Sequence, residues 1–210
     1  GNSITGVQLI RRLEGKEAHV WTTPLIVNKQ TGVKFGKSEA GAVWLDENKT
    51  SVYQFYQFWL NVDDESAVDY LKVYTLLSQE QIQGLAEKTA SQPQSREAQR
   101  ILAYEVTRLV HGAERAEAAQ KVTATLFGGN PVSSLSENER TMLAAEIPTA
   151  QAGSLVDILV NSGGASSLGE ARRLLESGAV SINGEKVFES RDVTAPSLVK
   201  KGKNSFVLVR

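Results

Sequence analysis

The chain lacks the residues on which several classes of protein chemistry depend. It has no cysteine, one methionine and two histidines, His19 and His111. Without cysteine it can form no disulfide, no thiolate zinc site, no iron–sulfur cluster and no thiol nucleophile. Two histidines are too few for a histidine-rich metal site. No apolar run approaches the roughly 20 residues that a membrane-spanning helix requires, so we expect no membrane segment.

The overall charge is nearly balanced, with 23 basic and 24 acidic residues among 210. This balance excludes a uniformly basic nucleic-acid coat protein but leaves room for a local basic patch. A hydrophobic fraction of 41% is ordinary for a globular chain and argues against general disorder. Residues 154–210 hold eight basic against six acidic residues, so we expect any polyanion to bind there.

The hydrophobic pattern divides the chain into three regions, 1–48, 49–148 and 149–210. The middle region predicts five or six helices and no strand, with capping boxes at Ser78-x-x-Gln81 and Ser136-x-x-Glu139. The last region predicts two short helices, a hairpin turning at Asn183-Gly184 and a final strand at 206–209. Residues 149–153 resemble a linker. The expected fold is therefore mostly α, with a small α+β module at the C-terminal end.

Five aromatic residues between Tyr53 and Trp59 could stack on nucleic-acid bases or pack inside the helical bundle. Five in seven positions cannot share one helix face, so we expect most of them to be core residues. His111 precedes Gly112 and is expected to end a helix.

A lysine-rich and glycine-containing loop occurs at Lys34-Phe35-Gly36-Lys37-Ser38. Two ammonium groups beside glycine N–H groups can bind a triphosphate. Taken by spacing alone, however, the same loop is more typical of a solvated surface turn. Ser38 could contact phosphate or simply cap a following helix.

These five residues resemble the KMSKS loop of class I aminoacyl-tRNA synthetases, in the form typical of the bacterial tyrosyl-tRNA synthetases. The flanking sequence follows the same family in order. The matching segments are Gly1-Asn2, Thr23-Pro24-Leu25, Ala40 to Leu45, Tyr53 to Asn61 and Leu109 to Gly112. The resemblance extends over essentially all 210 residues.

The resemblance implies an enzyme that activates tyrosine with ATP and Mg²⁺ and transfers it to tRNA(Tyr). Lys34 and Lys37 would then be catalytic residues that stabilise the departing pyrophosphate, and residues 34–38 would close over ATP. It also implies that residues 1–48 end a class I α/β catalytic domain. Residues 49–148 would be the anticodon-binding bundle and 149–210 an RNA-binding domain, in a cytoplasmic protein.

The last region resembles the alpha-L RNA-binding motif, carried by Gly169 to Leu175 and Gly178 to Val187. In it, Arg172, Arg173 and Lys186 are the candidate phosphate contacts. The alternative is that both arginines are ordinary exposed charges paired with acidic neighbours. Leu168 departs from the motif, which often has a basic residue there, so one phosphate contact is expected to be missing.

The 210 residues contain no His-x-Gly-His element, which class I synthetases use to bind ATP. With Gly1 as the first residue, we expect a C-terminal part of a longer synthetase that is inactive alone. We expect no tightly bound cofactor and a monomer, whereas the whole enzyme would be a homodimer. The alternative is a stand-alone RNA-binding or structural protein derived from a synthetase.

Overall fold

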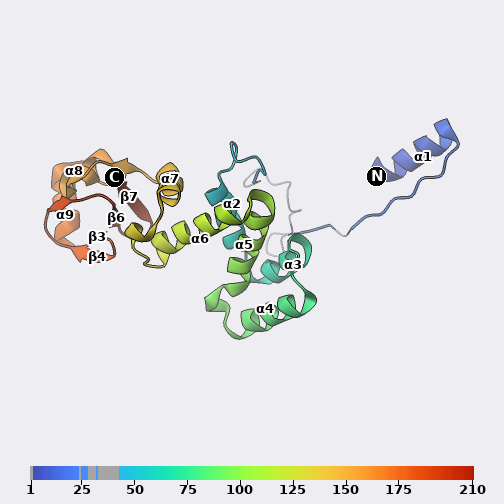
Figure 1. Cartoon of the computed structure of the whole chain (residues 1–210), viewed down its shortest axis with the longest axis horizontal. Helices are drawn as coiled ribbons and strands as arrows, with labels where there is room; N and C mark the ends of the chain where they lie inside the picture. Colours follow the sequence, from blue (N-terminus) through green and yellow to red (C-terminus); the bar gives the residue numbers. More distant parts are fainter. Residues whose placement is uncertain (1, 24, 28–31, 33–42) are drawn as a thin grey trace. The chain divides into compact units, whose positions relative to one another are not determined.

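The computed structural model describes residues 2–23, 25–27, 32 and 43–210. The chain forms two compact units, residues 1–42 and 43–210. In the first unit, helix α1 spans Asn2–Glu14 and buries none of its residues (Figure 1). It ends at Gly15, whose N–H donates to the Arg11 carbonyl at 3.1 Å. Gly15 has a positive φ of 64°, as expected where a helix terminates in a left-handed residue.

The second unit begins with a helical part. Its α-helices within residues 50–147 are α2 (Val52–Leu60), α3 (Asp64–Tyr74), α4 (Gln79–Ser91), α5 (Glu97–His111), α6 (Ala113–Phe127) and α7 (Glu137–Glu146). Two 3₁₀ turns join them, η1 (Pro93–Ser95) and η2 (Val132–Ser134). Six helices without a strand in this range confirm the predicted bundle.

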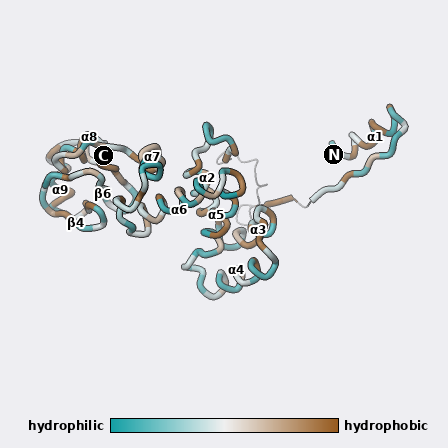
Figure 2. The backbone as a smooth tube through the Cα atoms, in the orientation of Figure 1, coloured by the Kyte–Doolittle hydropathy of each residue, from teal (hydrophilic) through white to brown (hydrophobic). Residues whose placement is uncertain are grey.

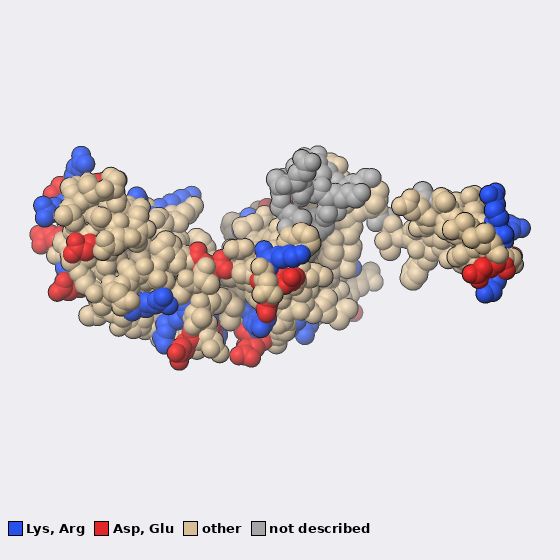
Figure 3. Space-filling view, turned by 90° about the horizontal axis from the view of Figure 1, so that it is seen from above, with Lys and Arg blue, Asp and Glu red and all other residues tan. Residues whose placement is uncertain are grey.

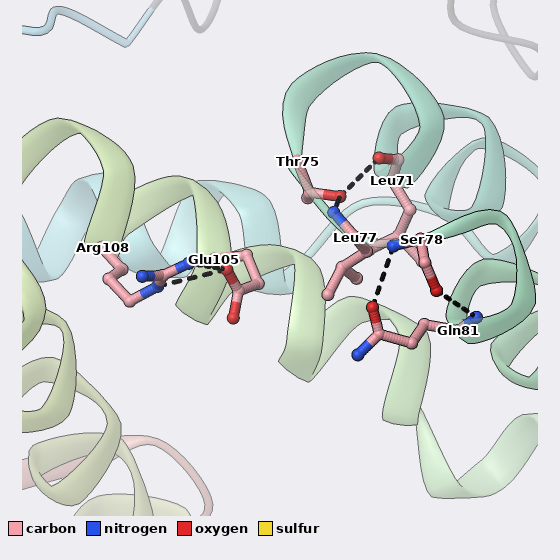
Figure 4. Close-up of polar contacts among 7 residues, drawn as sticks. All are labelled: Leu71, Thr75, Leu77, Ser78, Gln81, Glu105 and Arg108. Carbon is pink, nitrogen blue, oxygen red and sulfur yellow. Dashed lines mark hydrogen bonds and ion pairs between the residues drawn. The ribbon is translucent and has the colours of Figure 1, made fainter.

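Local side-chain caps determine where these helices begin. Ser78 Oγ accepts the Gln81 N–H at 3.2 Å, and the Gln81 amide accepts the Ser78 N–H at 2.9 Å (Figure 4). Ser136 and Glu139 form the same reciprocal pair, so both predicted capping boxes are confirmed. Farther along, Glu105 and Arg108 form an exposed ion pair one turn apart on α5 (Figure 4).

The bundle core is built largely from the aromatic residues of α2. Tyr53, Phe55, Tyr56 and Trp59 are all at most 8% exposed, which confirms the core interpretation. Tyr70 of α3, at 2%, joins them and was not expected from the sequence. Helix α5 packs against α2, α3, α4 and α6 and so lies at the centre of this part. By contrast, α4 is largely hydrophilic (Figure 2) and buries only Leu85.

A nearly buried carboxylate joins α6 to α7. Glu139 accepts a hydrogen bond from Lys121 Nζ at 2.8 Å and another from the Ser136 N–H at 2.7 Å. Burial by itself raises the pKa of Glu139, but the hydrogen bonds from Lys121 and Ser136 outweigh it and hold the pKa below its ordinary value.

Glu139 is therefore expected to make the free energy of unfolding depend on pH in the acid range. Because its pKa is lower in the folded chain, it stabilises fully above the unfolded-state pKa, and this contribution disappears as the pH falls through the folded-state value. Glu139→Gln should lower the free energy of unfolding by about 1–2 kcal/mol at pH 7. It should also make that free energy less dependent on pH between pH 7 and pH 3. Urea unfolding from pH 7 to pH 3 measures this. The exposed neighbour Glu137→Gln is the control, and an equal loss in both variants would contradict the assignment.

Residues 149–210 form the C-terminal module. Its helices are α8 (Leu155–Asn161) and α9 (Leu168–Glu176), and a five-stranded sheet has the order β1-β7-β6-β3-β4. The strands are β1 (Thr149–Ala150), β3 (Val180–Ile182), β4 (Glu185–Val187), β6 (Ser197–Lys201) and β7 (Ser205–Val209). A second pair joins β2 (Gly153–Ser154) to β5 (Asp192–Val193). The α+β prediction is thus confirmed.

The linker prediction for residues 149–153 is wrong. Thr149 and Ala150 pair in parallel with Leu208 and Val209, and the Arg210 N–H donates to the Ala150 carbonyl at 2.9 Å. The chain therefore passes directly from α7 into the edge of the sheet. The sequence hides this because the partner strand lies at the far end of the module, and two-residue strands carry little pattern of their own.

The sheet has two different faces. Val180, Ile182, Val199 and Val207 turn inward and pack with Ala171, Leu175 and the apolar residues of α8 in the module core. Because strand side chains alternate, the intervening residues lie on the opposite face. We call that face, formed by Ser181, Lys186, Leu198, Lys200, Phe206 and Leu208, the outer face.

Candidate nucleic-acid interface

The loop expected to close over ATP lies outside the described residues, and with it Lys34, Phe35, Gly36, Lys37 and Ser38. Among the residues that are described, no group of histidines and carboxylates could hold a metal ion. Within the same residues, every helix is too short or too polar to span a bilayer.

The described segment that follows this loop is held against the bundle. The Trp44 N–H donates to Thr50 Oγ1 at 3.0 Å. The Lys49 ammonium lies 4.3 Å from the Trp44 ring centroid, within cation–π range. Arg115 of α6 forms an ion pair with Glu47. The Arg115–Glu47 ion pair joins residues far apart in the sequence, and the other two contacts depend on how the loop folds. The sequence pattern therefore did not indicate them.

Helix α9 presents the two candidate arginines. Ser167 caps it by accepting the Glu170 N–H at 3.2 Å. Ala171 and Leu175 fix its inner face in the module core. Arg172 and Arg173 lie between these buried positions and are both exposed. In the part of the chain that the structure describes, neither arginine forms a hydrogen-bonded ion pair.

The neighbouring carboxylate Glu170 is occupied elsewhere. It accepts hydrogen bonds from the Ser166 hydroxyl and from the Ser166 N–H, the latter at 2.7 Å. These hydrogen bonds lower the pKa of Glu170, so it stays ionised at neutral pH without binding either arginine directly. Both guanidinium groups remain available to an external anion.

Lys186 is exposed on β4, one of the two edge strands of the sheet, but it does not share a face with the arginines. It pairs with Ser181 across the hairpin, whereas Val180 and Ile182 point toward the module core. Asn183 and Gly184 turn this hairpin with φ values of 48° and 91°, as the Asn-Gly signal predicts. Lys186 consequently projects from the outer face, while both arginines lie on the helix covering the inner face.

Beside Lys186, the register places Lys200 on the same outer face, with Ser181 between them. Lys200 was not among the predicted phosphate contacts, because strand β6 was not predicted. On the face drawn in the space-filling view, basic and acidic side chains of residues 43–210 are interspersed, and neither sign forms one continuous patch (Figure 3).

His111 ends α5 as expected, and its ring lies edge-on to Phe55 with centroids 4.8 Å apart. Burial lowers the pKa of His111, so the imidazole is neutral at pH 7 and does not supply a positive charge to the helix end. Its position in the aromatic core gives it a packing role.

Two family models match successive segments of the chain. The family described as "tRNA synthetases class I (W and Y)" matches residues 1–128, and the "Tyrosine--tRNA ligase SYY-like C-terminal domain" matches residues 137–210. The chain is 44% identical to a tyrosine–tRNA ligase of Desulfitobacterium hafniense and to tyrosine–tRNA ligase 2 of Bacillus anthracis. It is 42% identical to the tyrosine–tRNA ligase of Latilactobacillus sakei subsp. sakei.

In all three cases the similarity covers 100% of this chain and 53% of the relative, so the chain spans about half the length of these proteins. Among solved structures, a C-terminally truncated mitochondrial tyrosyl-tRNA synthetase of Coccidioides posadasii is 39% identical. That match covers 48% of this chain and 25% of the other, with a TM-score of 0.41.

Proposed function

Because the chain belongs to the class I tRNA synthetases (W and Y), we propose that it is the tRNA-binding part of a tyrosine–tRNA ligase. In this proposal residues 1–48 end the catalytic domain, 49–148 bind the anticodon region and 149–210 bind RNA through phosphate contacts. The observation that carries it is the C-terminal module, which presents Arg172 and Arg173 on a capped helix whose inner face is packed in the module core. Within the described residues, no carboxylate is bound to either of them.

The whole enzyme would join tyrosine to tRNA(Tyr) in two steps. The tyrosine carboxylate attacks the α-phosphorus of ATP, accompanied by Mg²⁺, and pyrophosphate leaves; the tyrosyl group then passes to the tRNA. Lys34 and Lys37 would stabilise the negative charge on the departing pyrophosphate, with Phe35, Gly36 and Ser38 completing the loop over ATP. No covalent enzyme intermediate is required.

Binding of tRNA(Tyr) tests the role of the arginines. Arg172→Ala combined with Arg173→Ala should weaken binding about tenfold or more at low salt, because two cations are removed from the phosphate contacts. It should also reduce the slope of log K against log salt by about 2, since two phosphate contacts are lost. Fluorescence anisotropy across a salt series measures both quantities.

The matched control is Arg11→Ala with Arg12→Ala, which removes two adjacent exposed arginines from α1. Equal affinities and slopes for the two double variants would remove α9 from the RNA-binding surface.

We also propose that these 210 residues do not activate tyrosine by themselves, because they include no His-x-Gly-His element. ATP–pyrophosphate exchange should stay at background with tyrosine present, even at protein concentrations that bind tRNA(Tyr). Exchange above background that disappears with Lys34→Ala would contradict this. Light scattering should give a monomer for this span, whereas we expect the whole enzyme to be a homodimer.

A further inference from the structure

The outer face of the sheet borders a cleft that the proposed phosphate contacts do not use. Its other wall is the C-terminal end of α6 and the turn leading to η2. The cleft has a volume of about 190 Å³. Six lining residues carry its chemistry: Thr125, Phe127, Asn130, Ser181, Lys200 and Phe206.

A buried hydroxyl in this lining has no partner among the described residues. Thr125 is 3% exposed, and its Oγ1 makes no hydrogen bond within that part of the chain. Two residues earlier on α6, the Thr123 hydroxyl donates to the Ala119 carbonyl at 2.7 Å. That bond is the usual solution for threonine in a helix. A buried hydroxyl left unsatisfied costs free energy, so rotation of the Thr125 side chain to bring this solvent-inaccessible oxygen to a polar group in the cleft would be favourable.

Among the described residues, the charged side chains at and beside the cleft are basic. The Lys200 ammonium lies 5.2 Å from the Phe206 ring centroid, a cation–π contact that keeps it at the cleft wall. Across the strands, Lys186 and Lys200 both flank Ser181 on this face. Within the described residues, no aspartate or glutamate lines the cleft. Glu185, an acidic residue on β4, pairs with Ile182 and so belongs to the opposite face.

An exposed aromatic ring stands at the same place. Phe127, the last residue of α6, is 58% exposed, and its ring lies perpendicular to the Phe206 ring with centroids 5.5 Å apart. This contact holds Phe127 in place and leaves ring surface open to solvent. A rigid exposed ring beside an ammonium group and hydroxyls is the combination on which unpaired nucleotides bind.

We propose that this cleft binds one unpaired nucleotide of the RNA, with its base on Phe127, its phosphate at Lys200 and a sugar or base oxygen accepting from Thr125. The inference rests on the proposed tRNA-binding function and adds a second contact surface, on the side of the sheet opposite to Arg172 and Arg173.

Matched substitutions in the full 210-residue chain test the cleft, with tRNA(Tyr) as the probe. Phe127→Ala should weaken binding about tenfold, as expected for one lost stacking contact. The control is Phe188→Ala, because Phe188 is 57% exposed on the same C-terminal module, and this substitution should leave tRNA(Tyr) affinity unchanged.

Lys200→Gln should reduce the slope of log K against log salt by about 1, because one phosphate contact is lost. Lys203→Gln, which removes another exposed lysine, should leave the affinity nearly unchanged. Thr125→Val should weaken binding without lowering the melting temperature.

Photocross-linking tests the cleft without deleting a side chain. Benzoylphenylalanine at position 127 should cross-link tRNA(Tyr) at an unpaired nucleotide, whereas the same group at position 188 should not. If the parent chain binds tRNA(Tyr) but the cleft variants match their controls and no cross-link forms, the cleft assignment is wrong and the proposed function stands. If the parent chain does not bind tRNA(Tyr), the proposed function fails and the cleft assignment fails with it.

Discussion

Leu102→Ala is expected to lower the free energy of unfolding of the bundle by about 3 kcal/mol, within the roughly 2–5 kcal/mol seen for buried leucines. Leu102 is 0% exposed on α5, the helix that packs against four others. The substitution removes apolar contacts and leaves a cavity that the surrounding helices cannot fill by small movements. A loss of this size is a large fraction of the stability of an ordinary domain.

The control lies on the same helix. Leu109 is 59% exposed. Leu109→Ala should therefore change stability by no more than about 0.5 kcal/mol, as is usual for surface positions. Urea unfolding followed by circular dichroism measures both variants. Similar losses in the two would mean that α5 does not occupy the centre of the core.

Leu175→Ala should cost about 3 kcal/mol in the C-terminal module and also weaken tRNA(Tyr) binding. Leu175 is 2% exposed and, with Ala171, is one of two α9 residues buried in the module core. Without it, α9 loses the packing that holds Arg172 and Arg173 in position. Salt-dependent binding should consequently fall along with thermal stability.

Leu168→Ala on the same helix is the comparison, because Leu168 is 48% exposed. We expect it to leave both melting temperature and RNA affinity nearly unchanged. Thermal melts and anisotropy titrations on the two proteins measure this. If Leu175→Ala destabilised the module but bound tRNA(Tyr) as tightly as Leu168→Ala, the arginines would not depend on α9 for their placement.

Helix ends are predictable here because they depend on neighbours in the sequence. Ser78 with Gln81 and Ser136 with Glu139 cap as the patterns indicate. The Asn183-Gly184 turn is equally visible, since both positions need a positive φ that those residues tolerate.

The buried face of α3 is harder to predict. The spacing favours Val68, Leu71 and Tyr74 or Thr75 on one face, whereas Ala67 and Tyr70 are the residues buried beside Leu71. Val68 is only half-buried. A short helix with apolar residues on several sides can turn more than one face inward, and contact with its neighbours decides which.

Strand β6 escapes prediction because its partners, β3 and β7, are chosen by tertiary pairing. A weak signal is present: Leu198-Val199 stands between Pro196 and Gly202, both typical of strand limits. Missing β6 also hides Lys200, and with it the cleft. The candidate arginines could be predicted, but the separation of Lys186 from them depends on strand register, which fixes the face on which each side chain lies.

The sequence by itself determined the family, the helical middle region, the α+β end and the residue types available for binding phosphate. Those features follow from local periodicity, caps and turn residues, together with a long stretch of matching sequence. Only the tertiary structure decided that residues 149–150 join the sheet and that Lys186 and Lys200 share its outer face. It also decided that Thr125 is buried with no partner among the described residues. Each of these depends on contacts between residues distant in the chain, which no local pattern specifies.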